Sequence, residues 1–212
     1  MNRIVVFALT LVAAASMAAV SHAEDGIDKA KAQNFDAKLF ARPVDQKAYA
    51  CFVRRYDASH LAQHPRQKVS AMRMLVTAAI PPDDQTTTNY SFYLGVKYRN
   101  RAGNFDSGGS CHHSTAEEKG GEIHLSCGVE CDGGGITVAM KDDKSAIVEL
   151  ERVRMWDRKK PDAETGHDLE AGADDKTFRV DRADLGECAE LVIDRNDLAA
   201  LRKARLAELR QK

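Results

Sequence analysis

Apolar and polar side chains alternate along most of the chain after residue 47, which is the pattern of β-strands with one buried face. The alternation is most regular over Tyr90–Arg99, where every second residue is aromatic or aliphatic. Further strands are predicted at Tyr49–Tyr56, Val69–Ala79 and Phe105–His112, each bounded by turn-forming residues. Strands that follow one another through short turns predict antiparallel pairing.

A hairpin is predicted with its turn at Asp132 and Gly133, because Asp-Gly between apolar runs favours a two-residue turn with positive φ at both positions. Pairing outward from this turn places Cys127 opposite Val138 and brings the apolar residues to one face. Cys131 is then expected on the same inward face as Cys127.

Two later strands are predicted, at Ala146–Trp156 and Phe178–Arg182. The apolar residues of Ala146–Trp156 change phase halfway along, and a β-bulge near Glu151 and Arg152 would return them to one face. The charged segment between these strands, Asp157–Asp175, is expected to be a loop.

The periodicity becomes helical after the last strand. Asp184 and Glu187 have the spacing of a capping box, and a second helical segment is expected over Asp197–Leu209 with Asn196 as its N-cap. The pattern as a whole predicts a mainly β fold, an antiparallel meander of about eight strands curled into a small barrel or a strongly twisted sheet. A C-terminal α-helix packs on it, and a two-sheet β-sandwich is the alternative.

The first 23 residues have the features of an export signal. Arg3 precedes an apolar run rich in Ala and Val, and small residues occupy the two positions that signal peptidase requires, Ser21 and Ala23. We therefore expect cleavage after Ala23, a periplasmic or secreted location, and no later membrane span. The chain then divides into a signal peptide (1–23), a polar lead-in that is mobile or loosely docked (24–46), an antiparallel β domain (47–183) and a C-terminal helical segment (184–212).

The charge of the expected mature chain is nearly balanced. Removal of Arg3 with the signal leaves 30 of the 31 basic residues against 32 acidic ones. No basic patch or acidic tail stands out, which disfavours nucleic acid and anionic membranes as partners.

All five cysteines follow the expected cleavage site, and disulfides are typical of exported chains. Cys127 and Cys131 lie four residues apart on one strand, roughly 13 Å, which is too far for a bridge between them. Cys111, on the preceding strand, is the natural partner of one of the two. Cys51 and Cys188 are placed to close the fold end to end, which leaves one free thiol.

The same region offers the residue types that bind metals: Cys111, His112, His113, Cys127 and Cys131. The spacing lacks a Cys-x-x-Cys pair, and thiolates oxidise in an oxidising compartment, so a disulfide-braced sheet is favoured and no cofactor is expected. Two other groups are weaker candidates. His60 and His64 stand four apart but precede a helix-breaking proline, so a surface turn is expected. The acidic cluster around Gly172 lacks the order of ligands in a calcium loop.

Three segments carry a resemblance: YACFVRRYDASHLAQHP (49–65), CGVECDGGG (127–135) and LEAGADDKTFRVDR (169–182). They resemble segments of uncharacterised exported (periplasmic) proteins of proteobacteria. The resemblance implies a periplasmic location and no particular activity.

Two function classes follow. The first, favoured because no catalytic motif is present, is a soluble exported binding or interaction module whose partner is a small ligand or a periplasmic protein. The second is an enzyme or metal-binding protein that uses the Cys111–Cys131 cluster, or His112, His113 or His167 with nearby carboxylates. A cleft that holds a His–Asp pair would favour an enzyme, and an apolar cavity without titratable groups would favour binding.

Overall fold

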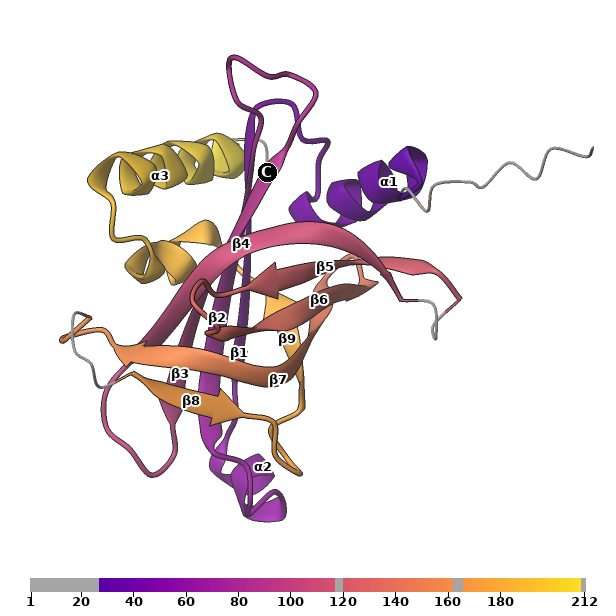
Figure 1. Ribbon diagram of the computed structural model, residues 1–212. Helices are drawn as coiled ribbons and strands as arrows, with labels where there is room; N and C mark the ends of the chain where they lie inside the picture. The colour runs from indigo at the N-terminus through magenta and orange to yellow at the C-terminus, as the bar shows by residue number, and fades with distance from the viewer. Residues whose placement is uncertain (1–26, 117–119, 162–165, 211–212) are drawn as a thin grey trace, which may run out of the picture.

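The described residues form nine antiparallel strands in one sheet, and eight of these strands close into a ring (Figure 1). The order round the ring is β1-β2-β3-β4-β5-β6-β7-β9, and β9 pairs back with β1, while β8 lies on β7 outside the ring. The computed structural model describes residues 27–116, 120–161 and 166–210. The mainly β, antiparallel prediction is confirmed, and one closed sheet takes the place of the two-sheet alternative.

The strands are β1 Lys47–Arg55, β2 Val69–Ala79, β3 Asn89–Tyr98, β4 Phe105–Ala116, β5 Glu122–Gly128, β6 Gly134–Asp142, β7 Ser145–Asp157, β8 His167–Glu170 and β9 Thr177–Arg182. The helices are α1 Lys29–Phe40, α2 Ala58–Gln63, the 3-10 helix η2 Leu185–Leu191 and α3 Arg195–Arg210.

The main core consists of the side chains that point into the ring. Since alternate residues of a strand face opposite sides, each strand contributes every second residue, as the alternation predicts. The largest of these side chains are fully buried and come from four different strands: Phe52, Phe92, Phe105 and Phe178.

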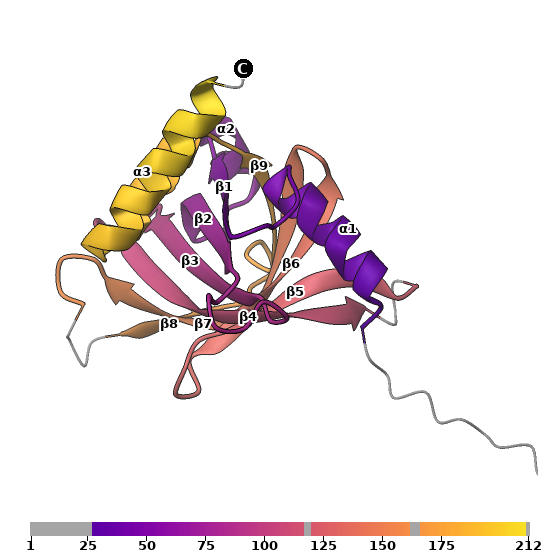
Figure 2. The ribbon, with the colours of Figure 1, turned by 90° about the horizontal axis from the view of Figure 1, so that it is seen from above.

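A second core lies outside the ring, where η2 and α3 cover the outer face of β1 and β2 (Figure 2). Its centre is the disulfide between Cys51 of β1 and Cys188 of η2. The other disulfide joins Cys111 and Cys127, which are direct cross-strand partners on β4 and β5 and point into the main core. Of the two partners that the sequence leaves open for Cys111, the structure has Cys127.

The expectation that residues 24–46 dock only loosely is wrong for α1. Phe35, Leu39 and Phe40 of this helix are buried in the main core, and α1 contacts β1, β5 and β6. Asp28 caps the helix by accepting a hydrogen bond from the backbone N–H of Lys31. The polar average of the segment hides a narrow apolar stripe, which is enough to hold a helix that has one buried edge.

The turn between β5 and β6 lies one residue earlier than predicted, at Cys131 and Asp132. Both residues have positive φ, 55° and 59°, and Gly133 donates its backbone N–H to Glu130 across the turn. The register of the hairpin therefore shifts by two residues, so that Cys127 faces Ile136. A shift of two keeps every strand residue on its predicted face, but Cys131 is in the turn and exposed, not inward.

The glycines after the turn explain why it lies one residue earlier than predicted. A Cβ atom at Gly134 would overlap the carbonyl oxygen of Arg152, and one at Gly135 would overlap the carbonyl oxygen of Cys127. These two glycines serve the close approach of neighbouring strands. Gly134 also has the positive φ, 73°, that the sequence analysis assigned to Gly133.

The predicted bulge in β7 is confirmed. Gly135 pairs with Arg152 and Ile136 with Leu150, so Glu151 is the extra residue. With this residue inserted, Leu150 and Val153 are both buried in the ring.

The expectation of a loop throughout Asp157–Asp175 is wrong, because β8 lies within it. Leu169 of β8 pairs with Val153 of β7 and is buried. A four-residue strand with one buried apolar side chain has no alternation to detect, since its neighbours Asp168 and Glu170 are charged.

The helix caps differ in detail from the prediction. Asp184 caps the start of η2, but Glu187 pairs with Arg55 of β1 and does not complete a capping box. Asp194, not Asn196, accepts the backbone hydrogen bonds at the start of α3.

The expected signal peptide, residues 1–23, lies outside the described residues. In the part of the chain that is described, no helix has both the length and the apolar character needed to cross a bilayer.

The two disulfides are expected to differ in what they contribute to stability. They join residues 137 and 16 apart in sequence, and loop-closure entropy predicts losses of about 5 and about 3 kcal/mol when each is removed. We therefore expect Cys51→Ala/Cys188→Ala to lower the free energy of unfolding more than Cys111→Ala/Cys127→Ala, measured by urea unfolding without reductant. Cys131→Ala is the control and should leave stability unchanged. A reversed order would contradict the entropic account.

Substitution of three glycines separates backbone strain from close approach. Gly134→Ala should destabilise by more than about 2 kcal/mol, because Gly134 combines positive φ with the contact to Arg152. Gly120→Ala has the same positive φ in open space and should cost about 1 kcal/mol. Gly128→Ala has neither feature and should cost least. Equal effects at Gly134 and Gly120 in thermal melts would show that the close approach is unimportant.

Candidate functional site

The predicted Cys–His cluster is divided between separate environments. Cys111 and Cys127 bond to each other, so neither has a thiolate to offer a metal, and Cys131 is an exposed thiol in the turn. No group of three or more His, Cys, Asp or Glu residues that could hold a metal ion occurs in the described part of the chain. His112 is exposed on the outer face of β4, while His113 points to the inner face.

His113 belongs to a hydrogen-bonded cluster under α1. Its Nε2 lies 2.9 Å from Oδ1 of Asp36, and the hydroxyl of Tyr90 donates to Oδ2 of Asp36 at 2.6 Å. The side chains of His113 and Asp36 are only 13% and 11% exposed. Burial, together with the adjacent Asp36 carboxylate, raises the pKa of Tyr90, so the phenol remains a donor.

This His–Asp pair is the arrangement that would favour an enzyme if it lay in a cleft. Here both oxygens of Asp36 are used, and the rings of Phe35 and Tyr90 pack against His113 at centroid distances of 5.8 and 4.8 Å. The cluster joins α1 to β3 and β4. We interpret it as the polar contact that fixes α1, because removing one member would leave a buried charge or hydroxyl without its partner.

The other candidates from the sequence also have structural partners. His60 and His64 stack on each other at 4.3 Å between ring centroids. His60 lies on the short helix α2, in place of the predicted surface turn, and His64 is the C-cap of this helix. His60 also contacts Gln67. In the acidic cluster, Asp168 pairs with arginines of β7, and Asp175 is buried with its carboxylate bound to backbone N–H groups.

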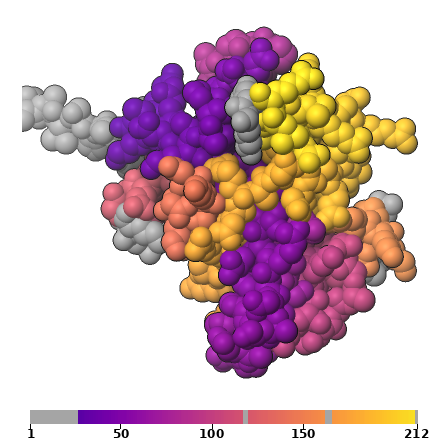
Figure 3. All heavy atoms as spheres, turned by 180° about the vertical axis from the view of Figure 1, so that it is seen from behind, coloured from indigo at the N-terminus to yellow at the C-terminus, as the bar shows by residue number. Residues whose placement is uncertain are grey.

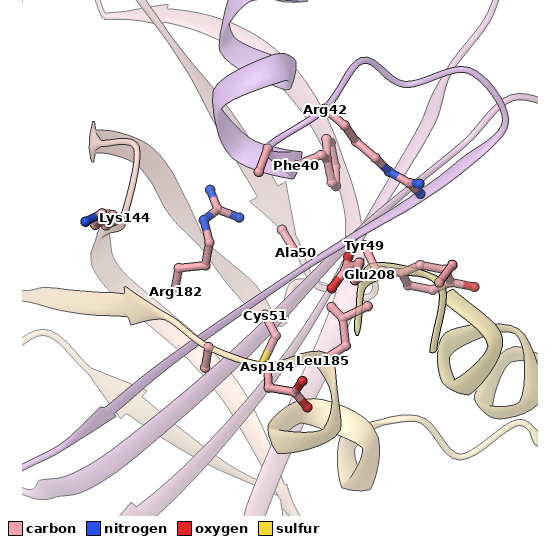
Figure 4. A pocket seen from close by; sticks show the side chains of 13 residues that line it. Phe40, Arg42, Tyr49, Ala50, Cys51, Lys144, Arg182, Asp184, Leu185 and Glu208 are labelled. Atoms are coloured by element: carbon pink, nitrogen blue, oxygen red, sulfur yellow. The ribbon is translucent and has the colours of Figure 1, made fainter. Parts of the chain in front are cut away.

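A cavity of about 480 Å³ lies between the C-terminal end of α1, strands β1 and β9, and helices η2 and α3 (Figure 4). Figure 3 shows α1 in indigo and α3 in yellow on the same face of the molecule. The lining residues are Phe40, Ala41, Arg42, Tyr49, Ala50, Cys51, Lys144, Arg182, Ala183, Asp184, Leu185, Ala207 and Glu208. The volume lies within the range of pockets for small molecules. We call this cavity the α1–α3 pocket.

The α1–α3 pocket has an apolar wall, which the fold places there. Phe40 is buried at the end of α1, Ala50 on the inner side of β1, and Leu185 at the start of η2. The bridged Cys51 adds its side chain to this wall.

The basic side of the pocket centres on Arg182, at the end of β9. Its guanidinium donates to the carbonyl oxygens of Lys38, Leu39 and Asp143 at 2.7, 3.0 and 3.1 Å, and Figure 4 shows it reaching the last turn of α1. These bonds use three of its five N–H groups and leave one on each terminal nitrogen. In the described residues, no carboxylate lies within ion-pair distance of Arg182.

Arg182 is thus a half-buried cation held by neutral carbonyl groups. Burial lowers the pKa of its guanidinium, an effect that the more distant carboxylates of Glu208 and Asp143 oppose, but an arginine stays protonated at any physiological pH. Arg42 and Lys144 add two exposed cations to the rim of the pocket. On the acidic side, Asp184 is already paired with Arg205 at 2.5 Å. Glu208 is the second carboxylate of the lining, so three cations face two carboxylates, and the balance of charge favours an anion.

Sequence reasoning missed the α1–α3 pocket, since its lining residues come from five separate elements. One signal was present. Arg182 occupies an inward-facing position of the last strand, two residues after Val180 and four after Phe178, and a cation at such a position is unusual.

Comparison of the chain with protein-family models, with curated proteins and with solved structures finds no match. The resemblance to exported proteins of proteobacteria stays a prediction, and the α1–α3 pocket must be judged from its own chemistry.

The tyrosines predict an alkaline limit to stability. All five have a raised pKa, chiefly through burial, and that of Tyr98 rises to about 12: Tyr49, Tyr56, Tyr90, Tyr93 and Tyr98. Above pH 10 the unfolded chain therefore loses protons that the folded chain keeps, so their contribution to stability is complete below pH 10 and is lost as the pH rises further. Urea unfolding should show this decline.

Tyr90→Phe tests the assignment, because this variant removes one of the five hydroxyl groups. It should lower stability at pH 8 by about 1 kcal/mol, through the lost hydrogen bond to Asp36, and should make the decline above pH 10 shallower. An unchanged slope would show that Tyr90 ionises equally in the folded and unfolded chains.

Proposed function

We propose that the protein is an exported, disulfide-braced binding protein whose α1–α3 pocket takes a small amphiphilic anion. The observation that carries the proposal is Arg182, a half-buried guanidinium with two remaining N–H groups and no carboxylate within ion-pair distance in the described residues. A carboxylate, sulfonate or phosphate group would meet both the charge and the geometry of such a guanidinium.

The apolar wall supports the amphiphilic part of the proposal. Phe40, Ala50 and Leu185 face a cavity of about 480 Å³, which has room for an apolar body several carbon atoms in size beside the charged group. Each buried CH₂ of a ligand would contribute about 0.8 kcal/mol, and the charge-assisted hydrogen bonds about 1.5–3 kcal/mol.

Two observations support the exported location. Cys51–Cys188 and Cys111–Cys127 are disulfides, which persist in oxidising compartments. The amino-terminal sequence has the features of an export signal, and the resemblance to proteobacterial exported proteins agrees with a periplasmic protein.

A binding protein fits the described residues better than an enzyme. The His113–Asp36 pair is engaged in holding α1, and the cysteines that would serve the metal-binding alternative are bonded to each other. The α1–α3 pocket contains arginine, lysine and two carboxylates, but no histidine, serine or free cysteine that could act as a nucleophile or general base near neutral pH.

The test uses 1-anilinonaphthalene-8-sulfonate, an amphiphilic anion that fluoresces when it enters an apolar site. The wild-type protein should bind it with a 1:1 stoichiometry. Arg182→Leu should weaken binding by about ten- to a hundredfold and Lys144→Ala by a few fold, because the first is half-buried and the second exposed.

Arg182→Leu also breaks two hydrogen bonds to α1 and could weaken binding by disturbing the fold. A pair of variants on α3 therefore tests the pocket independently of Arg182. Ala207→Trp fills the mouth of the pocket and should abolish binding, whereas Ala199→Trp adds the same side chain to an exposed position of α3 outside the lining. Binding that survives Ala207→Trp would refute the proposal. Native mass spectrometry of the protein purified from periplasm would identify a retained ligand.

A further inference from the structure

A second cavity has a volume of about 250 Å³. The segments that line it lie at the end of the ring near α2, remote from α1 (Figure 1). Three segments that are distant in sequence enclose it: the loop Pro65–Lys68, the end of β3 with the turn after it (Tyr98–Arg101), and His167 at the start of β8. It shares no lining residue with the α1–α3 pocket. We call it the β3–β8 cavity.

All arginine, lysine, aspartate and glutamate residues that line the β3–β8 cavity are basic. Arg66, Lys68, Arg99 and Arg101 line it, and no aspartate or glutamate does. Within the described ranges, none of the four side chains lies within ion-pair distance of a carboxylate. Four cations around one small space repel one another, and an anion between them would relieve this repulsion.

Two aspartates contact the loop Pro65–Lys68 through its main chain and not through its basic side chains. Asp175 is fully buried and accepts the backbone N–H groups of Lys68 and Val69 at 2.6 and 3.1 Å, and Asp174 accepts the backbone N–H of Arg66 at 3.2 Å. Both aspartates hold the loop in place by its main chain, and the basic side chains stay free of them.

Two of the guanidinium groups are held in place without a counter-charge. Arg99 donates through Nη1 to the carbonyl oxygens of Leu61 and His64 at 3.0 and 3.2 Å. Arg101 lies over the ring of Phe105, with its Cζ 4.4 Å from the ring centroid. Such pre-positioned donors bind an anion without the cost of ordering free side chains.

His167 adds a polar group to the wall of the cavity. Its Nε2 lies 2.9 Å from the hydroxyl of Tyr98, and its Nδ1 is buried without a hydrogen-bond partner among the described residues. Burial raises the pKa of Tyr98 to about 12, so this hydroxyl keeps its proton. Burial, followed by repulsion from Arg101 and Arg154, lowers the pKa of His167, while Asp168 acts in the opposite direction.

We propose that the β3–β8 cavity binds a small tetrahedral oxyanion, a phosphate or sulfate group, between the side chains of Arg66, Lys68, Arg99 and Arg101. The volume is below that of pockets for drug-sized molecules and suits an ion. The site is independent of the proposed function of the α1–α3 pocket, and either can fail without the other.

The experiment titrates the wild-type protein with sodium sulfate at constant ionic strength, balanced with sodium chloride, and follows His167 by NMR. Sulfate beside Arg101 should offset the repulsion on the imidazole and raise the pKa of His167 by about 0.5–1 unit. A shift that chloride reproduces in full would mean general screening, and it would overturn the proposal.

Variants assign the effect to the cavity. Arg101→Ala should weaken sulfate binding about tenfold, and Arg101→Glu should raise the pKa of His167 in the absence of sulfate and abolish its response. The matched control is Arg202→Ala, an exposed arginine of α3, which should bind sulfate as the wild type does. Unchanged binding by Arg101→Glu would overturn the proposal.

Three further ligands define the chemical class of the anion. Inorganic phosphate should bind at least as tightly as sulfate. Comparison of phosphate with phenyl phosphate shows whether the site prefers the free ion or a phosphate ester, because the preferred form binds more tightly. Acetate should bind much more weakly, and acetate binding equal to that of sulfate would overturn the assignment to a tetrahedral oxyanion. Arg182→Leu should leave sulfate binding unchanged, which separates this result from a failure of the α1–α3 pocket.

Discussion

The closure of the sheet between β1 and β9 is the constraint on which the rest of the structure depends. This seam has only two registered residue pairs, Phe52 with Arg182 and Val53 with Asp181, whereas β1 and β2 share nine. Without it the inward side chains would face an open sheet, so a short contact secures the whole main core. The chain reinforces it on both sides.

On the outer side of the seam, Cys51 precedes Phe52 and bonds to Cys188. Across the seam, Arg54 of β1 pairs with Asp181 of β9 at 3.2 Å. On the inner side, Arg182 binds the last carbonyl groups of α1, where the partial negative charge of a helix C-terminus favours a cation. The α1–α3 pocket thus lies directly over the seam. A ligand anion on Arg182 would add a contact where the ring has its fewest backbone pairs, so that binding and closure would be coupled through one side chain.

The sequence predicts the strands in which buried and exposed residues alternate several times. The inward faces of β2, β3 and β4 and the bulge at Glu151 follow from a period of two, because each strand has several buried residues that agree with one another. The elements it misses have few such residues. In β8 only Leu169 is buried, and the stripe on α1 is narrow. The turn at Cys131 was misplaced because glycines that permit close approach look the same in sequence as glycines that make a turn.

The functional sites could not be assembled from sequence for a different reason. Net charge near zero disfavours large polyanionic partners, whose many charges sum over a whole surface, but it does not limit a small ligand. A small ion responds to charges within a screening length of about 8–10 Å, and the fold decides which charges meet there. Arg66 and Arg101 come together because β2 pairs antiparallel with β3, with Val69 opposite Tyr98, which places the loop before β2 beside the turn after β3. Asp174 and Asp175 accept hydrogen bonds from backbone N–H groups of the same loop. These two aspartates are therefore bonded to the main chain of the loop, and its basic side chains are left to face the β3–β8 cavity.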